Sequence, residues 1–355
     1  MTRARVARVL QTLRSAAMLY DASFVAVARR ALHVRLRRGF RLAEASSLRL
    51  LDPRLGKPEL QAVVSRAELR PVQRRLNPRQ LEQLTEDKVV FYRLCERMAL
   101  PTPALHAVVY RDEPGWTRDG SRPQTGDEWA AALERVLPDE FVVKPSRGHF
   151  GLGVRAYELR DGAAVDPGGA APLPVLVERL REHPRYRSWV FQERLRSHPL
   201  LESLSGSRTL QTVRVITLLG AESRARILHA ELKVVMGGAL VDNIHDGATG
   251  NGVCTVALDT GRLDTVVAPH PDGTGPMRVE AHPCTGVVFA DQVLPFWPAA
   301  VNLVERAAEA FAPIRTLGWD VALTADGPVI VETNMWWGPP NELGVMREIF
   351  EALVA

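Results

Sequence analysis

The pattern of hydrophobic and polar positions divides the chain into a helical first part and a mixed remainder. Residues 1–75 are rich in Arg and Leu and nearly free of glycine, which predicts helices that end before a boundary at Asn77-Pro78. Beyond it, apolar runs predict strands over 104–110, 141–144, 154–159, 188–192, 213–218, 225–236, 252–258, 318–323 and 328–332. Helical signals predict helices over 88–98 (capped by Thr85), 127–137, 174–182, 298–311 and 343–354, with loops over 111–128 and 160–173.

The last two predicted strands form a hairpin that carries three oxygen-bearing side chains. If its turn centres on Asp326, Asp320 lies directly opposite Glu332, and Cβ atoms opposed in this way are about 5 Å apart. Asn334 shares their face if the strand continues. Two carboxylates so close repel and need a cation between them, and oxygen ligands suit Mg²⁺. Polar residues on a solvated hairpin face are the alternative.

A glycine-rich turn follows the predicted strand that ends at Lys144. It contains Gly148, Gly151 and Gly153, but it lacks the G-K-[S/T] of a P-loop and precedes a strand rather than a helix. Glycines between two strands let backbone N–H groups bend over phosphate oxygens, and Lys144 would reach a phosphate from the strand below. An ordinary glycine-rich hairpin without a ligand is the alternative.

Two further charges stand inside apolar strand patterns. Arg214 and Lys233 each interrupt such a run, and a charge in a buried strand needs a partner. A bound phosphate and a structural ion pair both satisfy this requirement. The segment from Asp242 to His245 reads as a polar loop, and Cys254 is expected to be a small core residue.

Composition is that of an ordinary globular protein. The 355 residues are 46% hydrophobic and 24% charged, which favours two or three subdomains sharing a cleft. The three cysteines, Cys95, Cys254 and Cys284, lack the spacing of a disulfide framework or a zinc site. No signal-peptide h-region is recognised, and the apolar run from Ala22 to Ala28 is too short to span a bilayer. We therefore expect a cytoplasmic protein.

Charge is distributed unevenly along the chain. Residues 1–41 hold ten arginines, from Arg3 to Arg41, and a single acid, Asp21. A basic segment of this kind can bind nucleic acid, an anionic membrane surface or an acidic partner. A solvated face of two amphipathic helices is the simpler interpretation, and we favour it.

Taken in order, several motifs resemble the ATP-grasp superfamily. These are Lys88 on a helix before LPTP, the strand FVVKP with its glycine loop, FQERL, and GWDVALTADGPVIVETN. The chain is most similar to the sugar-transfer-associated ATP-grasp family, and it also resembles the glutamate ligases that modify ribosomal protein tails. The resemblance covers roughly residues 77–350. It implies an α/β (α+β) protein with the ATP-grasp fold, in which ATP lies between two mixed α/β lobes next to an N-terminal helical region.

Together with the boundary at Asn77-Pro78, this resemblance predicts four regions, the first of which the ATP-grasp pattern does not cover. They are a basic helical region (1–76), an N-terminal lobe (77–137), a small lobe with the glycine flap and hinge (138–195) and a large lobe with the metal site (196–355). Lys88 and Lys144 would contact ATP phosphates beneath the flap, which begins at Ser146. In the hinge, Gln192, Glu193, Arg194 and Leu195 would hold the adenine, whose edge the Glu193 carbonyl and the Leu195 N–H would read.

The remaining implied roles concern the reaction itself. Arg214 and Lys233 would hold the transferred phosphate or the acceptor, and Asn243 and His245 would line the reaction centre. The implied ligands of Mg²⁺, with Mn²⁺ as the substitute, are Asp320, Glu332 and Asn334. After His245 the usual Gly-Gly pair is missing. Trp336 and Trp337 follow the metal ligands and would stack on a sugar or an apolar acceptor or, as we favour, pack in the core.

The implied activity is that of an ATP- and Mg²⁺-dependent ligase. It would form an acyl phosphate from a small-molecule carboxylate and transfer the acyl group to an amine, in polysaccharide or peptide-conjugate biosynthesis, where the acceptor would be a saccharide or a peptide. A kinase acting on a sugar or another small hydroxyl is the first alternative. The second is a nucleotide-regulated binding module that docks on a membrane or a polymer through its basic N-terminus. No nucleic-acid partner is expected.

Overall fold

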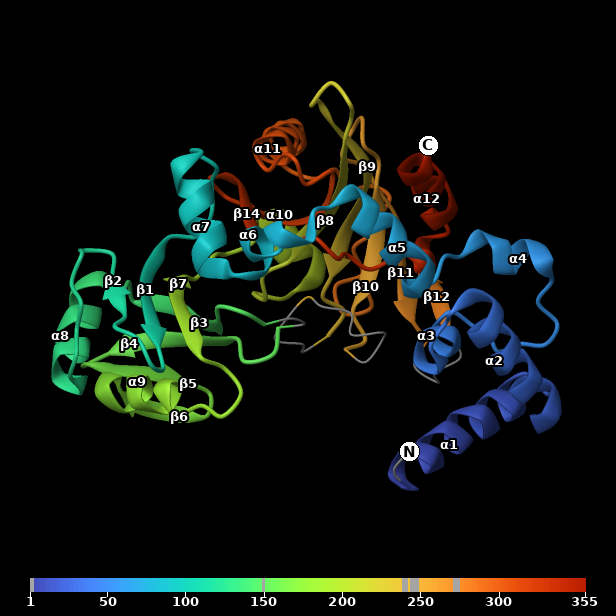
Figure 1. Ribbon diagram of the computed structural model, residues 1–355, viewed down its shortest axis with the longest axis horizontal. Coiled ribbons are helices and arrows are strands. Elements are labelled where there is room, and N and C mark those ends of the chain that lie inside the picture. Colours follow the sequence, from blue (N-terminus) through green and yellow to red (C-terminus); the bar gives the residue numbers. More distant parts are fainter. Residues whose placement is uncertain (1–2, 149–150, 238–241, 243–248, 271–274) are drawn as a thin grey trace.

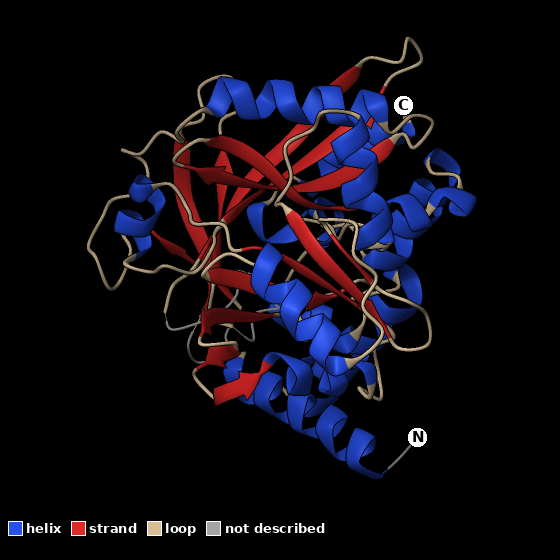
Figure 2. Cartoon of the chain, turned by 90° about the vertical axis from the view of Figure 1, so that its left-hand side faces the viewer, coloured by secondary structure: helices blue, strands red, loops and turns tan. Residues whose placement is uncertain are grey.

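The computed structural model describes residues 3–148, 151–237, 242, 249–270 and 275–355 (Figure 1). Within them the chain forms two antiparallel sheets with helices packed against them, and a group of N-terminal helices at one end. The expected mixed α/β fold with an N-terminal helical region is therefore confirmed. Figure 2 shows the N-terminus at the edge of the molecule, away from the strands of both sheets.

The smaller sheet holds seven strands in the described residues, in the order β2-β1-β7-β3-β4-β5-β6. The strands are β1 (Leu105–Tyr110), β2 (Trp116–Thr117), β3 (Glu140–Pro145), β4 (Arg155–Arg160), β5 (Ala163–Asp166), β6 (Gly169–Pro172) and β7 (Ser188–Glu193). Helices α8 (Gly126–Val136) and α9 (Leu173–Arg181) supply Trp129 and Leu176 to its apolar core. The loop predicted over 160–173 is wrong, because small residues there pair as β5 and β6.

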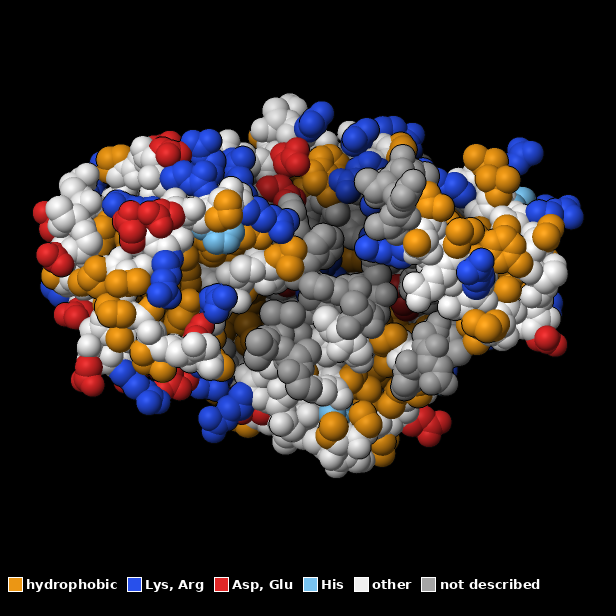
Figure 3. All heavy atoms as spheres, turned by 90° about the horizontal axis from the view of Figure 1, so that it is seen from below, with side chains coloured by type: hydrophobic (Ala, Val, Ile, Leu, Met, Phe, Trp, Pro, Cys, Tyr) orange, Lys and Arg blue, Asp and Glu red, His pale blue; other side chains and the backbone are white. Residues whose placement is uncertain are grey.

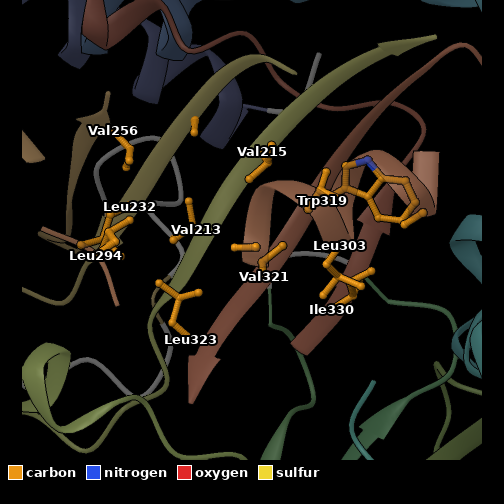
Figure 4. Packing of buried hydrophobic residues seen from close by; sticks show 14 of the residues in the cluster. Val213, Val215, Leu232, Val256, Leu294, Leu303, Trp319, Val321, Leu323 and Ile330 are labelled. Carbon is orange, nitrogen blue, oxygen red and sulfur yellow. The ribbon is translucent and has the colours of Figure 1, made fainter. Parts of the chain in front are cut away.

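The larger sheet also holds seven described strands, in the order β12-β11-β10-β9-β8-β13-β14. The strands are β8 (Thr212–Leu219), β9 (Ala225–Val234), β10 (Gly252–Val256), β11 (Leu263–Pro269), β12 (Pro276–Val279), β13 (Thr316–Thr324) and β14 (Gly327–Asn334). Residues that alternate along these strands, among them Val213, Val215, Trp319 and Val321, meet α11 (Trp297–Ala310) in the main core (Figure 4). Alternation sends the residues between them to the opposite face.

Four short helices pack against the larger sheet. They are α6 (Gln83–Glu86), α7 (Lys88–Arg97), α10 (Pro199–Ser205) and α12 (Met346–Val354). The cap of α7 is Asp87 rather than the predicted Thr85, because the Asp87 carboxylate accepts a hydrogen bond of 3.0 Å from the Val89 amide. Cys254 lies in the main core, as expected.

The N-terminal region consists of helices, as predicted for residues 1–75. They are α1 (Arg3–Leu19), α2 (Phe24–Arg38), α3 (Leu42–Ser47), α4 (Lys57–Ala62) and α5 (Arg66–Leu76). The first four share a small apolar core of their own that includes Leu13, Val27, Val34 and Phe40. α5 instead packs with α12 against β8 of the larger sheet. No helix in the described part of the chain has both the length and the apolarity that a membrane crossing requires.

Candidate functional site

A cavity of about 980 Å³ lies between the two sheets. The smaller sheet and its glycine turn contribute Lys144, Gly148, Gly151 and Gly153, and α7 contributes Lys88. The larger sheet contributes Lys233, Asp320 and Glu332 from the opposite side. The fold therefore brings residues from widely separated stretches of sequence to one cleft.

The β13–β14 hairpin places Asp320 opposite Glu332, as predicted, but by a different route. Its turn has two residues, because Thr324 pairs with Gly327, so the predicted centre at Asp326 is wrong. That register alone would set Asp320 opposite Val331. A β-bulge between the Asp320 and Val321 pairs adds one residue to β14 and restores the opposition. As a consequence Val331 and Glu332 both line the cavity.

Charged residues form a row across four strands of the larger sheet. Glu332 pairs with Asp320, Asp320 with Arg214, and Arg214 with Glu231, in β14, β13, β8 and β9 respectively. Cross-strand partners share a face, so this charge row lies on one side of the sheet while the neighbouring Val213 and Val215 pack in the main core. The apolar strand patterns that Arg214 and Lys233 interrupt are explained by this alternation.

Asp320 is the centre of the charge row. Its Oδ1 and Oδ2 lie 2.6 and 3.0 Å from Nε and Nη2 of Arg214, and Lys233 Nζ lies 2.9 Å from Oδ1. Burial opposes ionisation, but these two cations hold the pKa of Asp320 well below its ordinary value. Of the two partners considered for Arg214 and Lys233, the structure therefore shows the ion pair.

Lys144 and Lys88 line the same cavity as Asp320 and Glu332 of the charge row. Lys88 Nζ lies 3.6 Å from Glu332 Oε2 and donates to the Gly148 carbonyl at 3.2 Å. Lys144 Nζ donates to the Tyr92 hydroxyl at 2.8 Å. Burial, together with the charge of Lys88, lowers the pKa of Lys144 to about 7. A bound anion would relieve this repulsion, so the pair is suited to hold phosphate oxygens.

Tyr92 is a buried residue of this site that the sequence did not reveal. Besides Lys144, its hydroxyl lies 2.8 Å from the carbonyl of the bulged Val331 and 3.1 Å from Gln192 Oε1. It therefore connects α7 and the two sheets. From the sequence alone, Tyr92 is one of several apolar residues of a predicted helix. Its three hydrogen-bond partners lie far away in sequence, so no local pattern indicates them.

The base of the glycine turn is tied to α7. Ser146 Oγ donates to the Asp87 carboxylate at 2.5 Å, Arg147 pairs with the same carboxylate at 3.0 Å, and the Lys88 amide donates to the Ser146 carbonyl. Ser146 does not line the cavity. Its position fixes where the turn begins, and the glycines that follow reach into the cleft.

Only some of the predicted hinge residues line the cavity. Gln192, Arg194 and Leu195 line the cavity, where Leu195 lies with apolar Val142 and Val331. Glu193 does not line it, and its carboxylate accepts instead from the Ala104 amide at 3.1 Å. Val142, Leu195 and Val331 thus give the cavity an apolar part of its lining.

The acceptor side of the cleft is only partly described. Asn243 and His245 lie outside the described residues, so their predicted roles stay predictions. Asp242 is described and was missed as a site residue. Its Oδ2 accepts from the Thr212 amide at 2.8 Å and from the Thr212 hydroxyl at 2.5 Å, and both residues line the cavity.

The two tryptophans after the hairpin lie outside the cavity lining. Trp337 is buried and its indole N–H donates to Thr316 Oγ1 at 3.2 Å, which confirms the favoured core role for this residue. Trp336 packs on the main core and stacks with Arg70, whose guanidinium carbon lies 4.9 Å from the ring centre.

The residues present fit a hard divalent cation. Asp320, Glu332 and Asn334 supply oxygen atoms, and β14 extends to Asn334 as the prediction required. A carboxylate has about four acceptor positions, and the contacts with Arg214 and Lys233 occupy three of those on Asp320. The buried Nδ2 of Asn334 has no hydrogen-bond partner among the described residues. Asn334 pairs with Gly318 two residues beyond Glu332 but does not line the cavity, so its predicted role as a metal ligand stays a prediction.

Two antiparallel sheets with a cleft of lysines, a glycine turn and opposed carboxylates define the ATP-grasp fold. The chain belongs to the sugar-transfer associated ATP-grasp family, whose model matches residues 69–343. ATP-grasp enzymes in general use ATP and Mg²⁺. No curated protein matches the chain.

Solved structures resemble the chain more distantly. D-alanyl-alanine synthetase A from Vibrio cholerae is 11% identical, with a TM-score of 0.44 over 76% of this chain and 63% of its own. Phosphoribosylamine–glycine ligase from Thermotoga maritima is 15% identical, with a TM-score of 0.42 over 75% and 52%. An ADP complex of N5-carboxyaminoimidazole ribonucleotide synthetase is 12% identical, with a TM-score of 0.41 over 79% and 53%. The chain thus spans less than two thirds of each of these proteins, and the likeness carries no information on activity.

Proposed function

We propose that this protein is an ATP- and Mg²⁺-dependent ligase that activates a carboxylate and joins it to an amine. The observation that carries the proposal is the arrangement of the cleft, in which Lys88 and Lys144 line the same cavity as Asp320 and Glu332 and Lys88 contacts Glu332. Two cations for phosphates and an oxygen set for a divalent cation are what a nucleotide triphosphate requires. A saccharide or peptide amine is the acceptor class we propose, with a role in polysaccharide or peptide-conjugate biosynthesis.

Each group has a part in this proposal. Lys88 and Lys144 hold the β- and γ-phosphates, and the glycines beside them cover these phosphates from above. Val142, Leu195 and Val331 sandwich the adenine. Asp320, Glu332 and Asn334 hold Mg²⁺, which neutralises phosphate charge when it is bound. Arg214 and Lys233 keep Asp320 ionised and in place.

The chemistry proceeds in two displacements. A carboxylate oxygen of the substrate attacks the γ-phosphorus, the bond from that phosphorus to the bridging oxygen breaks, and ADP leaves. The amine nitrogen then attacks the acyl carbon, the bond to the phosphate oxygen breaks, and phosphate leaves while the nitrogen loses a proton. Lys144 stabilises negative charge on the transferred phosphoryl group. Closure of the glycine turn excludes water, which would otherwise hydrolyse the activated acyl group.

Trapping with hydroxylamine tests the proposal. Wild-type protein with Mg²⁺, ATP, a panel of candidate acids and hydroxylamine is expected to release ADP and form a hydroxamate in equal amounts. Glu332→Gln, which removes one proposed metal ligand, should lose both products, whereas Glu305→Gln in α11 should not, because Glu305 lies outside the cavity lining. ADP formed with no trapped acyl group would contradict the ligase. A phosphorylated product that is stable to hydroxylamine would instead establish a kinase.

A further inference from the structure

Half of the exposed large apolar side chains of the described chain lie at the N-terminal end of the molecule. Sixteen such residues are exposed in the described chain, and eight of them lie in α1, α2 or the turn between them: Val6, Leu10, Met18, Leu19, Phe24, Val25, Leu32 and Leu36. These two helices hold only 17 and 15 residues. Both also precede the part of the chain that matches the family, residues 69–343. The exposed apolar groups therefore belong to a feature that is separate from the nucleotide cleft.

The three most exposed apolar residues of α2 form one row along the helix. Val25, Leu32 and Leu36 are spaced by seven and four residues, so they share a face of the helix, and 64%, 58% and 73% of their surfaces are exposed. Val27 and Val34 lie on the opposite face and are buried in the N-terminal core. Because that inner face already provides the packing of α2, the outer row is not needed for folding.

Arginines surround this row. Arg29 lies within it, one turn after Val25, and Arg35 and Arg37 flank it on either side. All three are exposed, and no carboxylate of the described residues pairs with Arg29 or Arg37. Asp21 is the single acid among residues 1–41, which hold ten arginines. Figure 3 shows hydrophobic and basic side chains gathered at the right-hand end of the molecule, where α1 and α2 lie.

This combination favours one kind of partner over two others. A second copy that met the same face across a twofold axis would bring arginine against arginine, with no acid on the face to pair with them. Nucleic acid would pair with the arginines but would leave Val25, Leu32 and Leu36 against phosphates and water. An anionic bilayer satisfies both features, because its headgroups attract arginine and its acyl boundary accepts apolar side chains.

We propose that the outer face of α2, formed by Val25, Arg29, Leu32 and Leu36, docks the protein on the surface of an anionic lipid bilayer. The helix lies parallel to the surface, with Leu32 and Leu36 at the acyl boundary and Arg29, Arg35 and Arg37 at the headgroups. Met18 and Phe24, near the turn between α1 and α2, extend the same apolar contact. The proposal does not depend on the reaction in the cleft.

Co-sedimentation of the full-length chain with vesicles tests this inference. Wild-type protein is expected to bind vesicles of phosphatidylcholine mixed with phosphatidylglycerol but not vesicles of phosphatidylcholine alone. High salt should release it from the anionic vesicles. Arg29→Gln with Arg37→Gln should weaken binding about thirtyfold. Leu32→Gln with Leu36→Gln should weaken it about tenfold or more.

Controls separate docking from folding and from self-association. Val288→Gln with Val293→Gln changes two residues that are 43% and 45% exposed elsewhere and should leave vesicle binding unchanged. Circular dichroism is expected to show wild-type melting for each double variant. Equal binding to neutral and anionic vesicles, or no binding to either, would overturn the proposal. So would a dimer in sedimentation equilibrium that Leu32→Gln with Leu36→Gln dissolves, because the face would then serve a second copy.

Discussion

The charge row of the larger sheet and the outer face of α2 use charged side chains in opposite ways. In the charge row Asp320 is buried and contacts both Arg214 and Lys233 within 3.0 Å. On the outer face of α2, Arg29, Arg35 and Arg37 are exposed and lie beside apolar residues. Buried pairs are held in a fixed geometry and are little screened by salt, whereas exposed charges act over a wider surface and are screened. The first arrangement suits one small ligand and the second a broad surface.

Among the changes considered, replacing Asp320 should have the largest effect on stability. Asp320→Ala leaves Arg214 and Lys233 buried without their shared partner, so we expect the free energy of unfolding to fall by about 3–5 kcal/mol. Asp326→Ala is a matched control, because Asp326 is exposed in the turn of the same hairpin and should cost less than about 0.5 kcal/mol. Urea denaturation of both variants measures the difference. Similar costs for the two would show that the charge row is not a coupled unit.

Lys144 should produce the next largest effect, on nucleotide affinity and its dependence on pH. Its pKa of about 7 means that it is losing its proton near neutrality in the free protein, and bound phosphate requires the proton back. Affinity for an Mg²⁺-bound, non-hydrolysable ATP analogue should therefore fall about tenfold between pH 6 and pH 8. Lys144→Arg keeps its charge over this range and should give a flat profile, while Lys144→Met should bind weakly throughout. A wild-type profile as flat as that of Lys144→Arg would refute the electrostatic coupling.

Replacing Tyr92 should have a smaller effect, and it tests whether the Tyr92 hydroxyl helps to set the pKa of Lys144. Tyr92→Phe removes the hydroxyl that accepts from Lys144 Nζ, so the buried ammonium loses a partner at a cost of about 1–3 kcal/mol in stability. The pKa of Lys144 should fall further, which moves the pH profile of analogue binding to lower pH. Calorimetry at several pH values measures both. An unchanged midpoint would mean that Tyr92 serves packing alone.

The smallest change in stability is expected for α2, because its outer arginines are exposed. Arg29→Gln should change the free energy of unfolding by less than about 0.5 kcal/mol, because its guanidinium is exposed and unpaired among the described residues. Arg214→Gln makes the same substitution within the charge row and should be clearly destabilising. Thermal melts of the two variants compare the regions directly, and equal shifts would remove the distinction between them.

Sequence patterns were sufficient where the information is local. The strand around Lys144, the helix from Lys88 and the hairpin with Asp320 and Glu332 were all predicted. The pairing of Asp320 with Glu332 nevertheless depends on the β-bulge at Val331, which no local sequence pattern predicted. The prediction succeeded because an error in the turn and the missed bulge cancelled.

Residues whose roles depend on distant partners were harder to find. Tyr92 and Asp242 act through Lys144 and Thr212, which lie in other elements, so composition and spacing carried no signal for them. Arg214 and Lys233 were identified as charges that need a partner, but only the register of β8, β9 and β13 shows that both reach Asp320. β5 and β6 were missed because glycine, alanine and proline favour loops until a neighbouring strand pairs with them.

Calorimetric titration of a non-hydrolysable ATP analogue, with and without Mg²⁺, tests the central claim most directly. The wild-type protein is expected to bind the analogue more tightly when Mg²⁺ is present, and Glu332→Gln should retain the Mg²⁺-free affinity while losing that enhancement. Binding that is equally strong with and without Mg²⁺, or an enhancement that survives in Glu332→Gln, would contradict a metal-bound nucleotide at the opposed carboxylates.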